Sequence, residues 1–319
     1  MKVFITGITG FLGEPIVAAL QKRGHQVSGF VRYVSTRDAP TIEKMFPGIE
    51  ICFGDMQDAE SIKEALRKTQ PEVIINLAAQ TSVEYSFAHL REIYAVDFQG
   101  LVDLSLAAMQ YDPDLKKFIQ ASSVEVYGNQ AELPLREDMM PNPASPYGVA
   151  KVAGEYHLNY LHGGFKFPSV IIRSANTYSR TRNKGFVVEH IIHMLLEKQR
   201  ECKMGAPDSV RDFLYQEDET DFYCRLIEAG DDILGETINT GTNQPVSIRE
   251  LFKKLEGIIG YSPEKVHWNS FSRRPYEIKS LTMDVGKAKR LLGWEPNTSL
   301  DEGLKRTVDY WTSQIPPSS

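Results

Sequence analysis

The chain has 319 residues, a formal net charge of −6, and a composition that is 42% hydrophobic and 24% charged. This composition is typical of a globular protein with one large or two modest domains. Because the net charge is negative, the sequence does not indicate a basic surface for nucleic acid. No apolar run is long enough to span a membrane. We therefore expect the protein to bind neither nucleic acid nor a membrane.

Val3–Thr6 is an apolar, β-branched segment that predicts a buried strand. A glycine-rich turn follows it and leads into a helical pattern around Ile16–Leu20. Strand, glycine-rich turn and helix form the context of a dinucleotide-binding fingerprint, although the spacing here is G-x-x-G-x-x-G. The turn lets backbone N–H groups and the helix N-terminus approach a pyrophosphate. We therefore expect it to bind a cofactor through Gly7, Thr9, Gly10, Phe11, Leu12 and Gly13.

The second predicted strand, Gln26–Val31, ends next to Arg32 and has no acidic residue there. Folds that bind NAD usually place an acid at this point for the ribose 2′-hydroxyl. Arg32, with the hydroxyls of Ser35 and Thr36 and a second arginine, Arg37, suits an anionic 2′-phosphate instead. The sequence therefore predicts NADP as the cofactor, with NAD as the alternative.

Further strands and helices alternate through the first half of the chain. This βαβ order predicts an α/β fold, a Rossmann-type doubly wound parallel sheet covered by helices on both faces. We predict a NAD(P)-binding domain at residues 1–175 and a smaller C-terminal substrate-binding lobe at 176–319, interleaved at an approximate boundary. The remaining predicted strands are Glu50–Phe53, Val73–Leu77, Lys117–Ala121 and Ser169–Arg173, and the predicted helices include Ala59–Lys68 and Gln99–Gln110.

Tyr147 and Lys151 lie four residues apart in a segment that reads as a helix, so they share one face. A free phenol has a pKa near ~10, which means that its anion costs about 4 kcal/mol at neutral pH. An ammonium group held beside it recovers part of that cost and makes tyrosine a usable base. The pair is a candidate proton-transfer centre.

The cysteines, Cys52, Cys202 and Cys224, are scattered and odd in number, which favours reduced thiols in a cytoplasmic protein. A strand predicted at the start of the chain leaves no room for a signal peptide. Neither the cysteines nor the seven histidines form a metal-ligand pattern, so no metal site is expected.

The glycine-rich turn, the strand end at Ser122-Ser123 and the Tyr147–Lys151 pair together resemble the extended short-chain dehydrogenase/reductase family, in the branch that acts on nucleotide sugars. The resemblance covers nearly the whole chain. It implies that Ser123 binds the reacting hydroxyl, that Tyr147 removes its proton, and that Lys151 also contacts the cofactor ribose. It further implies cofactor contacts from Asp55, Met56, Leu77, Ala78 and Ala79.

Glu125 bears on the reaction class within this family. Simple C4-epimerases usually carry a small or apolar residue at this position, whereas 4,6-dehydratases carry a Glu that removes the C5 proton and then protonates the departing 6-hydroxyl. Val124 departs from the dehydratase pattern, which has Asp there in glucose-type and Ser in mannose-type enzymes. Nucleotide-glucuronate decarboxylases and some 4-keto reductases also carry an acid in this stretch.

Other segments are similar to GDP-mannose 4,6-dehydratase. Asp97 stands where many relatives have Asn, and the segments around Arg211 and Glu277 resemble that group's diphosphate and ribose contacts. Arginine suits a diphosphate by charge and fork geometry. The segment from Ser179 departs from the Gly-Pro-Arg that is usual in this family, so the sequence does not identify the sugar of the substrate. The implied substrate residues are Gln80, Ser82, Ser123, Asn176, Arg211, Arg274 and Glu277.

These observations favour an enzyme, a GDP-mannose-type nucleotide-sugar 4,6-dehydratase. It would oxidise C4 with NADP, eliminate water across C5 and C6, and return hydride to C6. A nucleotide-sugar C4-epimerase of the UDP-glucose type and a 4-keto-sugar reductase are alternatives. A non-catalytic NADP-binding redox sensor is an alternative of another class, which would not need the phenol–ammonium pair. The family resemblance implies a homodimer or a higher homo-oligomer.

Overall fold

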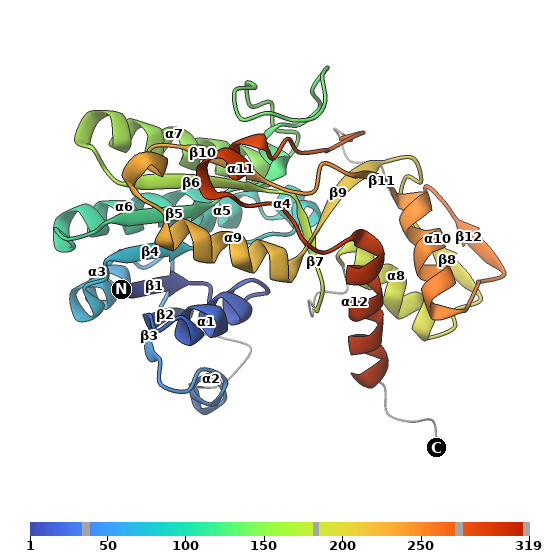
Figure 1. The fold of residues 1–319 in the computed structure, drawn as a ribbon, viewed down its shortest axis with the longest axis horizontal. Helices are drawn as coiled ribbons and strands as arrows, with labels where there is room; N and C mark the ends of the chain where they lie inside the picture. Colours follow the sequence, from blue (N-terminus) through green and yellow to red (C-terminus); the bar gives the residue numbers. More distant parts are fainter. Residues whose placement is uncertain (34–38, 181–184, 272–276, 315–319) are drawn as a thin grey trace.

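A computed structural model describes residues 1–33, 39–180, 185–271 and 277–314 (Figure 1). Its main feature is a seven-stranded parallel sheet in the order β10-β6-β5-β4-β1-β2-β3. The order reverses between β1 and β4, and ligands bind at such switch points, beyond the carboxyl ends of the strands. The strands are β1 (Lys2–Thr6), β2 (Gln26–Arg32), β3 (Glu50–Gly54), β4 (Val73–Asn76), β5 (Lys117–Ala121), β6 (Ser169–Ser174) and β10 (Thr237–Thr240).

Alternate residues of each strand supply the two apolar faces of the sheet. On β1, Val3 and Ile5 enter one core cluster and Phe4 enters the other. The first cluster is covered by α1 (Gly13–Lys22), α9 (Gln216–Glu228) and α11 (Gly286–Leu292). The second is covered by α3 (Ala59–Thr69), α6 (Gly100–Tyr111) and α7 (Pro146–Phe165), as Figure 1 shows. Burial on both faces explains why these strands read as continuous apolar runs.

A smaller lobe lies beyond the carboxyl edge of the sheet, with a third apolar cluster of its own. Its strands form a three-stranded sheet, β11-β9-β7, and a two-stranded sheet, β12-β8. They are β7 (Asn176–Tyr178), β8 (Glu201–Lys203), β9 (Val210–Tyr215), β11 (Pro245–Ser247) and β12 (Lys265–His267). The helices around them are α8 (Val187–Leu196), α10 (Ile248–Ile259) and α12 (Leu300–Gln314).

Short helices complete the described chain and lie mainly in its first half. The predicted helix from Gln99 begins one residue later as α6, and it is preceded by a π-helical turn. Such turns are frequent at functional sites. These elements are α2 (Ala39–Met45), α4 (Val83–Ala88), α5 (Leu90–Ile93), η1 (Tyr94–Gln99), η2 (Val124–Val126) and η3 (Asp231–Ile233).

The predicted α/β fold is confirmed, and all six predicted strands occur within one residue at either end. The seventh strand, Thr237–Thr240, was not predicted, because a four-residue segment that pairs along a single edge carries little periodicity. The division near residues 175 and 176 remains a prediction. β10, α9 and α11 come from the C-terminal part of the chain but pack on the sheet, so the two parts interleave.

Within the described ranges, every helix is too short or too polar to cross a membrane. Cys52, Cys202 and Cys224 are buried and form no disulfide. No cluster of three or more His, Cys, Asp or Glu side chains suited to a metal ion occurs in the same ranges.

Asp112, which follows α6, is a buried carboxyl whose two oxygens have no hydrogen-bond partner among the described residues. Burial raises the pKa of Asp112 to about 7. An acid whose pKa is raised by folding binds its proton more tightly in the native state. Its contribution to stability is therefore complete below pH ~4 and is lost as the pH rises through about 7.

We predict that Asp112→Asn raises the free energy of unfolding by about 1 kcal/mol or less at pH 4.5 and by roughly 2–4 kcal/mol at pH 8, because the amide carries no charge to bury. Urea unfolding at several pH values measures this difference. Asp114→Asn, which changes an exposed carboxylate two residues away, is the control. Identical pH dependence in the two variants would show that Asp112 carries no burial cost.

Candidate active site

The carboxyl edge of the sheet bounds a cavity of about 480 Å³ that extends from the glycine-rich turn to α7. It collects predicted cofactor residues from the ends of β1, β2, β3 and β4 and predicted catalytic residues from β5 and α7. The predicted residues that line it are Gly7, Thr9, Gly10, Phe11, Leu12, Gly13, Arg32, Asp55, Met56, Leu77, Ala78, Ala79, Gln80, Ser123, Glu125, Tyr147, Lys151 and Asn176. Residues more than 160 positions apart in sequence therefore share one cavity.

The glycine-rich turn fits the diphosphate of a dinucleotide. Gly7 has φ +70°, and a Cβ there would lie 2.9 Å from the backbone nitrogen of Ala78. A Cβ on Gly13 would lie 2.5 Å from the backbone of Ile8, so only glycine lets α1 begin this close to the preceding turn. Leu12 precedes α1 and makes no side-chain cap, so no capping side chain occupies the helix N-terminus, where a diphosphate would bind.

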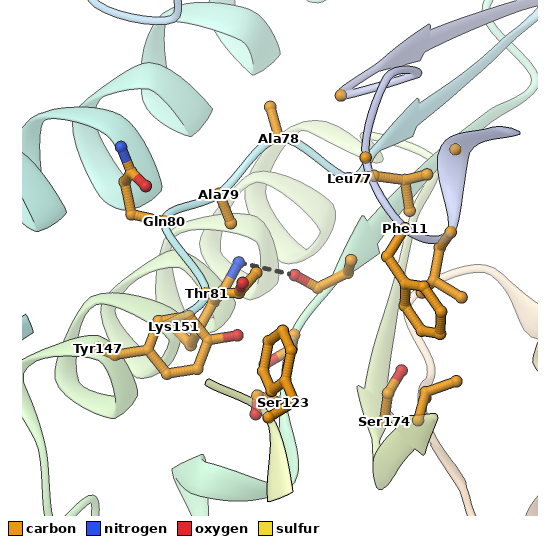
Figure 2. Close-up of a pocket in the computed structure, with 18 of the residues that line it drawn as sticks. Phe11, Leu77, Ala78, Ala79, Gln80, Thr81, Ser123, Tyr147, Lys151 and Ser174 are labelled. Carbon is orange, nitrogen blue, oxygen red and sulfur yellow. Dashed lines mark hydrogen bonds between the residues drawn. The ribbon is translucent and has the colours of Figure 1, made fainter. Parts of the chain in front are cut away.

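Ser123, Tyr147 and Lys151 lie together at the other end of the cavity, as Figure 2 shows. Ser145 caps α7 by accepting a hydrogen bond from Gly148 N at 3.1 Å, and Pro146 occupies the first helical turn. These two signals begin the helix where the tyrosine and lysine face β5. Lys151 Nζ lies 5.5 Å from the centre of the Tyr147 ring.

The environment of the free protein favours the phenol over the phenolate. Burial, with the carboxylates of Asp97 and Glu125, raises the pKa of Tyr147, and a hydrogen bond with Ser123 opposes that rise. Burial lowers the pKa of Lys151, and the carboxylates of Asp97 and Glu155 oppose that fall. Lys151 thus does not lower the pKa of Tyr147 below its usual range in the protein alone, contrary to the simplest expectation from their spacing.

Lys151 is held by a chain of buried hydrogen bonds that crosses the sheet. Its Nζ donates to the carbonyl of Ala121 at 3.0 Å, the contact dashed in Figure 2. Gln120 Nε2 donates to the same carbonyl at 2.8 Å and accepts at Oε1 from Asn76 Nδ2 at 2.7 Å. Thr6 donates to Asn76 Oδ1 at 2.5 Å and accepts from the backbone of Ala78. The chain links the glycine-rich turn to the ammonium group.

Glu125 is only 9% exposed and lies in the short helix η2. Ser123 caps that helix by accepting a hydrogen bond from Glu125 N at 3.2 Å. Glu125 lines the main cavity and also a second, small cavity of about 20 Å³. The preceding residue, Val124, is 2% exposed and belongs to the apolar core, so it offers no acid or hydroxyl.

The structure does not bring every predicted substrate residue into the main cavity. Arg211 and Glu277 line the small cavity beside Glu125. Ser82 is not among the lining residues, and its hydroxyl caps α4 by accepting a hydrogen bond from Tyr85 N at 3.2 Å. Arg274, like Ser35, Thr36 and Arg37, lies outside the described residues.

Several lining residues were not predicted from the sequence. Ser122 is fixed by a 2.5 Å hydrogen bond to Glu155, which also pairs with Arg173 at 2.7 Å. Ser174 lies at the end of β6, where the rule that ligands bind at strand ends could have pointed to it. Others come from the second lobe and carry no motif, among them Phe186, Glu189 and Phe213.

Comparison with known proteins gives two kinds of relative. A UDP-glucose 4-epimerase from Mycolicibacterium smegmatis is 31% identical over 98% of this chain and 99% of its own length. A mouse (Mus musculus) dTDP-D-glucose 4,6-dehydratase is 28% identical over 97% of this chain and 88% of its own length. The sequence relatives therefore include both epimerases and dehydratases.

Solved structures agree with the fold. A UDP-glucose 4-epimerase from Thermotoga maritima, solved with UDP-glucose, has a TM-score of 0.89 at 29% identity and covers 98% of this chain and 99% of its own. A UDP-glucose 4-epimerase from Thermus thermophilus, solved with NAD, has a TM-score of 0.88 at 25% identity and covers 99% of this chain and 100% of its own.

The GDP-mannose 4,6 dehydratase family model matches residues 4–307, nearly the whole chain. With the fold and cavity described above, this match shows that the chain belongs to the GDP-mannose 4,6 dehydratase family, among the extended short-chain dehydrogenase/reductase enzymes that epimerise or dehydrate nucleotide sugars.

Proposed function

We propose that the protein is an NADP-dependent nucleotide-hexose 4,6-dehydratase of the GDP-mannose type. The observation that carries this proposal is the position of Glu125, a nearly buried carboxyl that shares the cavity with Ser123, Tyr147 and Lys151. Oxidation at C4 needs only the last three side chains. A carboxyl in the same cavity adds the proton acceptor that an elimination requires.

The steps assign one role to each side chain. Ser123 binds the C4 hydroxyl, and Tyr147 accepts its proton while the nearby Lys151 ammonium stabilises the phenolate. The bound cofactor would accept the hydride from C4, add positive charge near Tyr147, and return the hydride at C6. Glu125 takes the C5 proton of the 4-keto sugar and gives it to the 6-hydroxyl, which leaves as water. Glu125 then takes up a proton from solvent and delivers it to C5 as the hydride adds at C6, and Tyr147 releases to solvent the proton that it took from the C4 hydroxyl. The products are the 4-keto-6-deoxy sugar and one water.

Burial supports this use of Glu125. A general acid–base must lie within hydrogen-bond reach of the proton that it moves, in a site from which bulk water is largely excluded. Glu125 lies between the apolar Val124 and Val126, both buried in the core.

A C4-epimerase is the second candidate, and two observations favour it. The curated relative at 31% identity is a UDP-glucose 4-epimerase. Val124 supplies neither the acid nor the hydroxyl that dehydratases of this family place before the glutamate. In an epimerase the hydride would return to C4 from the other side, and Glu125 would be a polar neighbour of the sugar.

The NADP preference rests on Arg32, whose exposed guanidinium lines the cavity at the end of β2. This end of the sheet receives the adenosine ribose in Rossmann folds, and a fork of N–H donors matches a 2′-phosphate. Asp55 lies at the end of the next strand and lines the same part of the cavity, but it stands one strand away from the position of the usual ribose-binding acid.

We also propose that the protein forms a homodimer through α6 and α7. Both helices carry large apolar side chains on their outer surfaces, and such patches mark association sites. On α6, Leu106 is 48% exposed, and on α7, Tyr156 and Tyr160 are 56% and 63% exposed. The two helices lie against each other through Leu101 and Gly154.

Tyr147→Phe should abolish turnover while leaving cofactor affinity within about twofold, because it removes the base and keeps the ring. Lys151→Ala should weaken cofactor binding as well, since the ammonium is expected to contact the nicotinamide ribose. Activity assays and calorimetric titration with NADP measure the two effects. Tyr261→Phe, which removes the hydroxyl of a tyrosine that does not line the cavity, is the control. Substantial turnover by Tyr147→Phe would overturn the assignment.

The wild-type protein should bind NADP more tightly than NAD, by about tenfold or more, which corresponds to one charge-assisted contact of roughly 1.5 kcal/mol. Arg32→Asp should remove or reverse this preference. Arg290→Asp, which changes an exposed arginine on α11, should leave it unchanged. A wild-type protein that prefers NAD would show that our interpretation of the second strand is wrong.

Glu125→Gln should still oxidise a nucleotide-hexose and form reduced cofactor. Its dehydration rate should fall by about 10²–10⁴-fold, which is the usual effect of removing a positioned acid–base. Exchange of the C5 proton with deuterated solvent should fall in parallel. Glu132→Gln in the following loop, where the carboxylate is exposed, provides the control. If Glu125→Gln dehydrates at the wild-type rate, the carboxyl is not the acid–base.

A further inference from the structure

A second buried carboxyl lies behind the cavity and has no role in the steps above. Glu219 of α9 is fully buried. Its Oε1 accepts a hydrogen bond from Ser174 Oγ at 2.7 Å, and its Oε2 accepts one from Thr240 Oγ1 at 2.8 Å. A single carboxyl therefore joins the end of β6, the end of β10 and helix α9.

Ser174 alone of these three side chains lines the cavity, where Figure 2 shows it on the same side as Phe11. Glu219 and Thr240 stand behind it. Burial raises the pKa of Glu219 to about 7, and the hydrogen bonds from the two hydroxyls oppose the rise. At pH 8 and above, the carboxylate accepts from both hydroxyls.

The carboxylate fixes the direction of the Ser174 hydroxyl. A serine has one hydrogen to donate, and an ionised carboxylate can only accept. The Ser174 hydrogen is therefore directed at Glu219, away from the cavity, and only oxygen lone pairs remain for a ligand. The buried Tyr223 hydroxyl interacts with Ser174, and burial raises the pKa of Tyr223, so this hydroxyl stays protonated and adds no second charge. As a donor it occupies one of the two lone pairs of Ser174 Oγ and leaves the other for a ligand.

The place of Ser174 in the sheet indicates which part of a dinucleotide meets it. The diphosphate belongs at the turn after β1 and the adenosine ribose at the end of β2. A bound nicotinamide would then be held on the other side, by residues at the ends of β4, β5 and β6 and by Tyr147 and Lys151, which line the same part of the cavity. The group that presents N–H donors at that end of the cofactor is the carboxamide.

We propose that Glu219 is a positioning residue that fixes Ser174 Oγ as a hydrogen-bond acceptor for the carboxamide N–H of the bound nicotinamide. The proposal rests on the proposed function only in that the protein binds a nicotinamide dinucleotide. It does not depend on whether the reaction is a dehydration or an epimerisation.

The test compares NADP with its 3-acetylpyridine analogue, in which a methyl group replaces the amide nitrogen. Calorimetric titration at pH 8.5 measures both affinities without turnover. The wild-type protein should bind the amide about fivefold more tightly, the size of one neutral hydrogen bond. Ser174→Ala and Glu219→Met should each reduce the preference to less than about twofold. Glu219→Met removes the acceptor and frees the serine to rotate while filling the same space.

Thr240→Val is the matched control. It removes the other hydrogen bond to Glu219 at equal volume but leaves Ser174 in place, so it should lower the melting temperature and keep the fivefold preference. A preference that survives Ser174→Ala or a folded Glu219→Met would overturn the proposal, and the carboxyl would be structural only. If Glu219→Met does not fold, Ser174→Ala against Thr240→Val still decides whether the serine is the acceptor.

A sugar hydroxyl is the other donor that Ser174 could meet. In that case the wild-type protein would bind NADP and the analogue equally, and Ser174→Ala would instead weaken the binding of GDP-mannose, which overturns the proposal. A wild-type protein that binds neither dinucleotide would refute the proposed function itself, and this inference with it.

Discussion

The active site depends on holding an ammonium group away from water. Lys151 is 4% exposed, and an ion moved into such surroundings loses stability unless it is paired and hydrogen-bonded. The protein compensates with the Ala121 carbonyl and with the charges of Asp97 and Glu155. The carbonyl is itself oriented by Gln120. Loss of one member would leave a buried polar group without its partner, so the chain acts as a unit.

The same chain explains why the site lies at this edge of the sheet. Thr6, Asn76 and Gln120 occupy the last positions of β1 and β4 and the next-to-last of β5, and parallel pairing aligns them side by side. The pairing that builds the sheet therefore also joins the glycine-rich turn to Lys151. Glu219 repeats the arrangement on the other side of the cavity, where it joins the ends of β6 and β10. Buried polar side chains that do not line the cavity thus hold the residues at the strand ends in place through hydrogen bonds.

The sequence predicts those parts of the molecule that local chemistry decides. Apolar β-branched runs predict the six strands, and the glycine spacing and the i, i+4 pair predict the turn and the centre on α7. Long-range packing decides the rest. The downward shift expected for the pKa of Tyr147 is absent, because burial and the carboxylates of Asp97 and Glu125 raise that pKa. Of the predicted substrate residues, Ser82 caps a helix, and Arg211 and Glu277 line the small cavity. Ser174 was not predicted, because its orientation depends on a glutamate 45 residues away.

The mass of the product formed by the wild-type protein tests the central claim most directly. The protein is incubated with NADP and GDP-mannose in deuterated water, alongside other nucleotide-hexoses, and the nucleotide sugar is analysed by mass spectrometry. Our account predicts a product that has lost one water and carries one solvent deuterium at C5. A product of unchanged mass that is the C4 epimer of the substrate would contradict it.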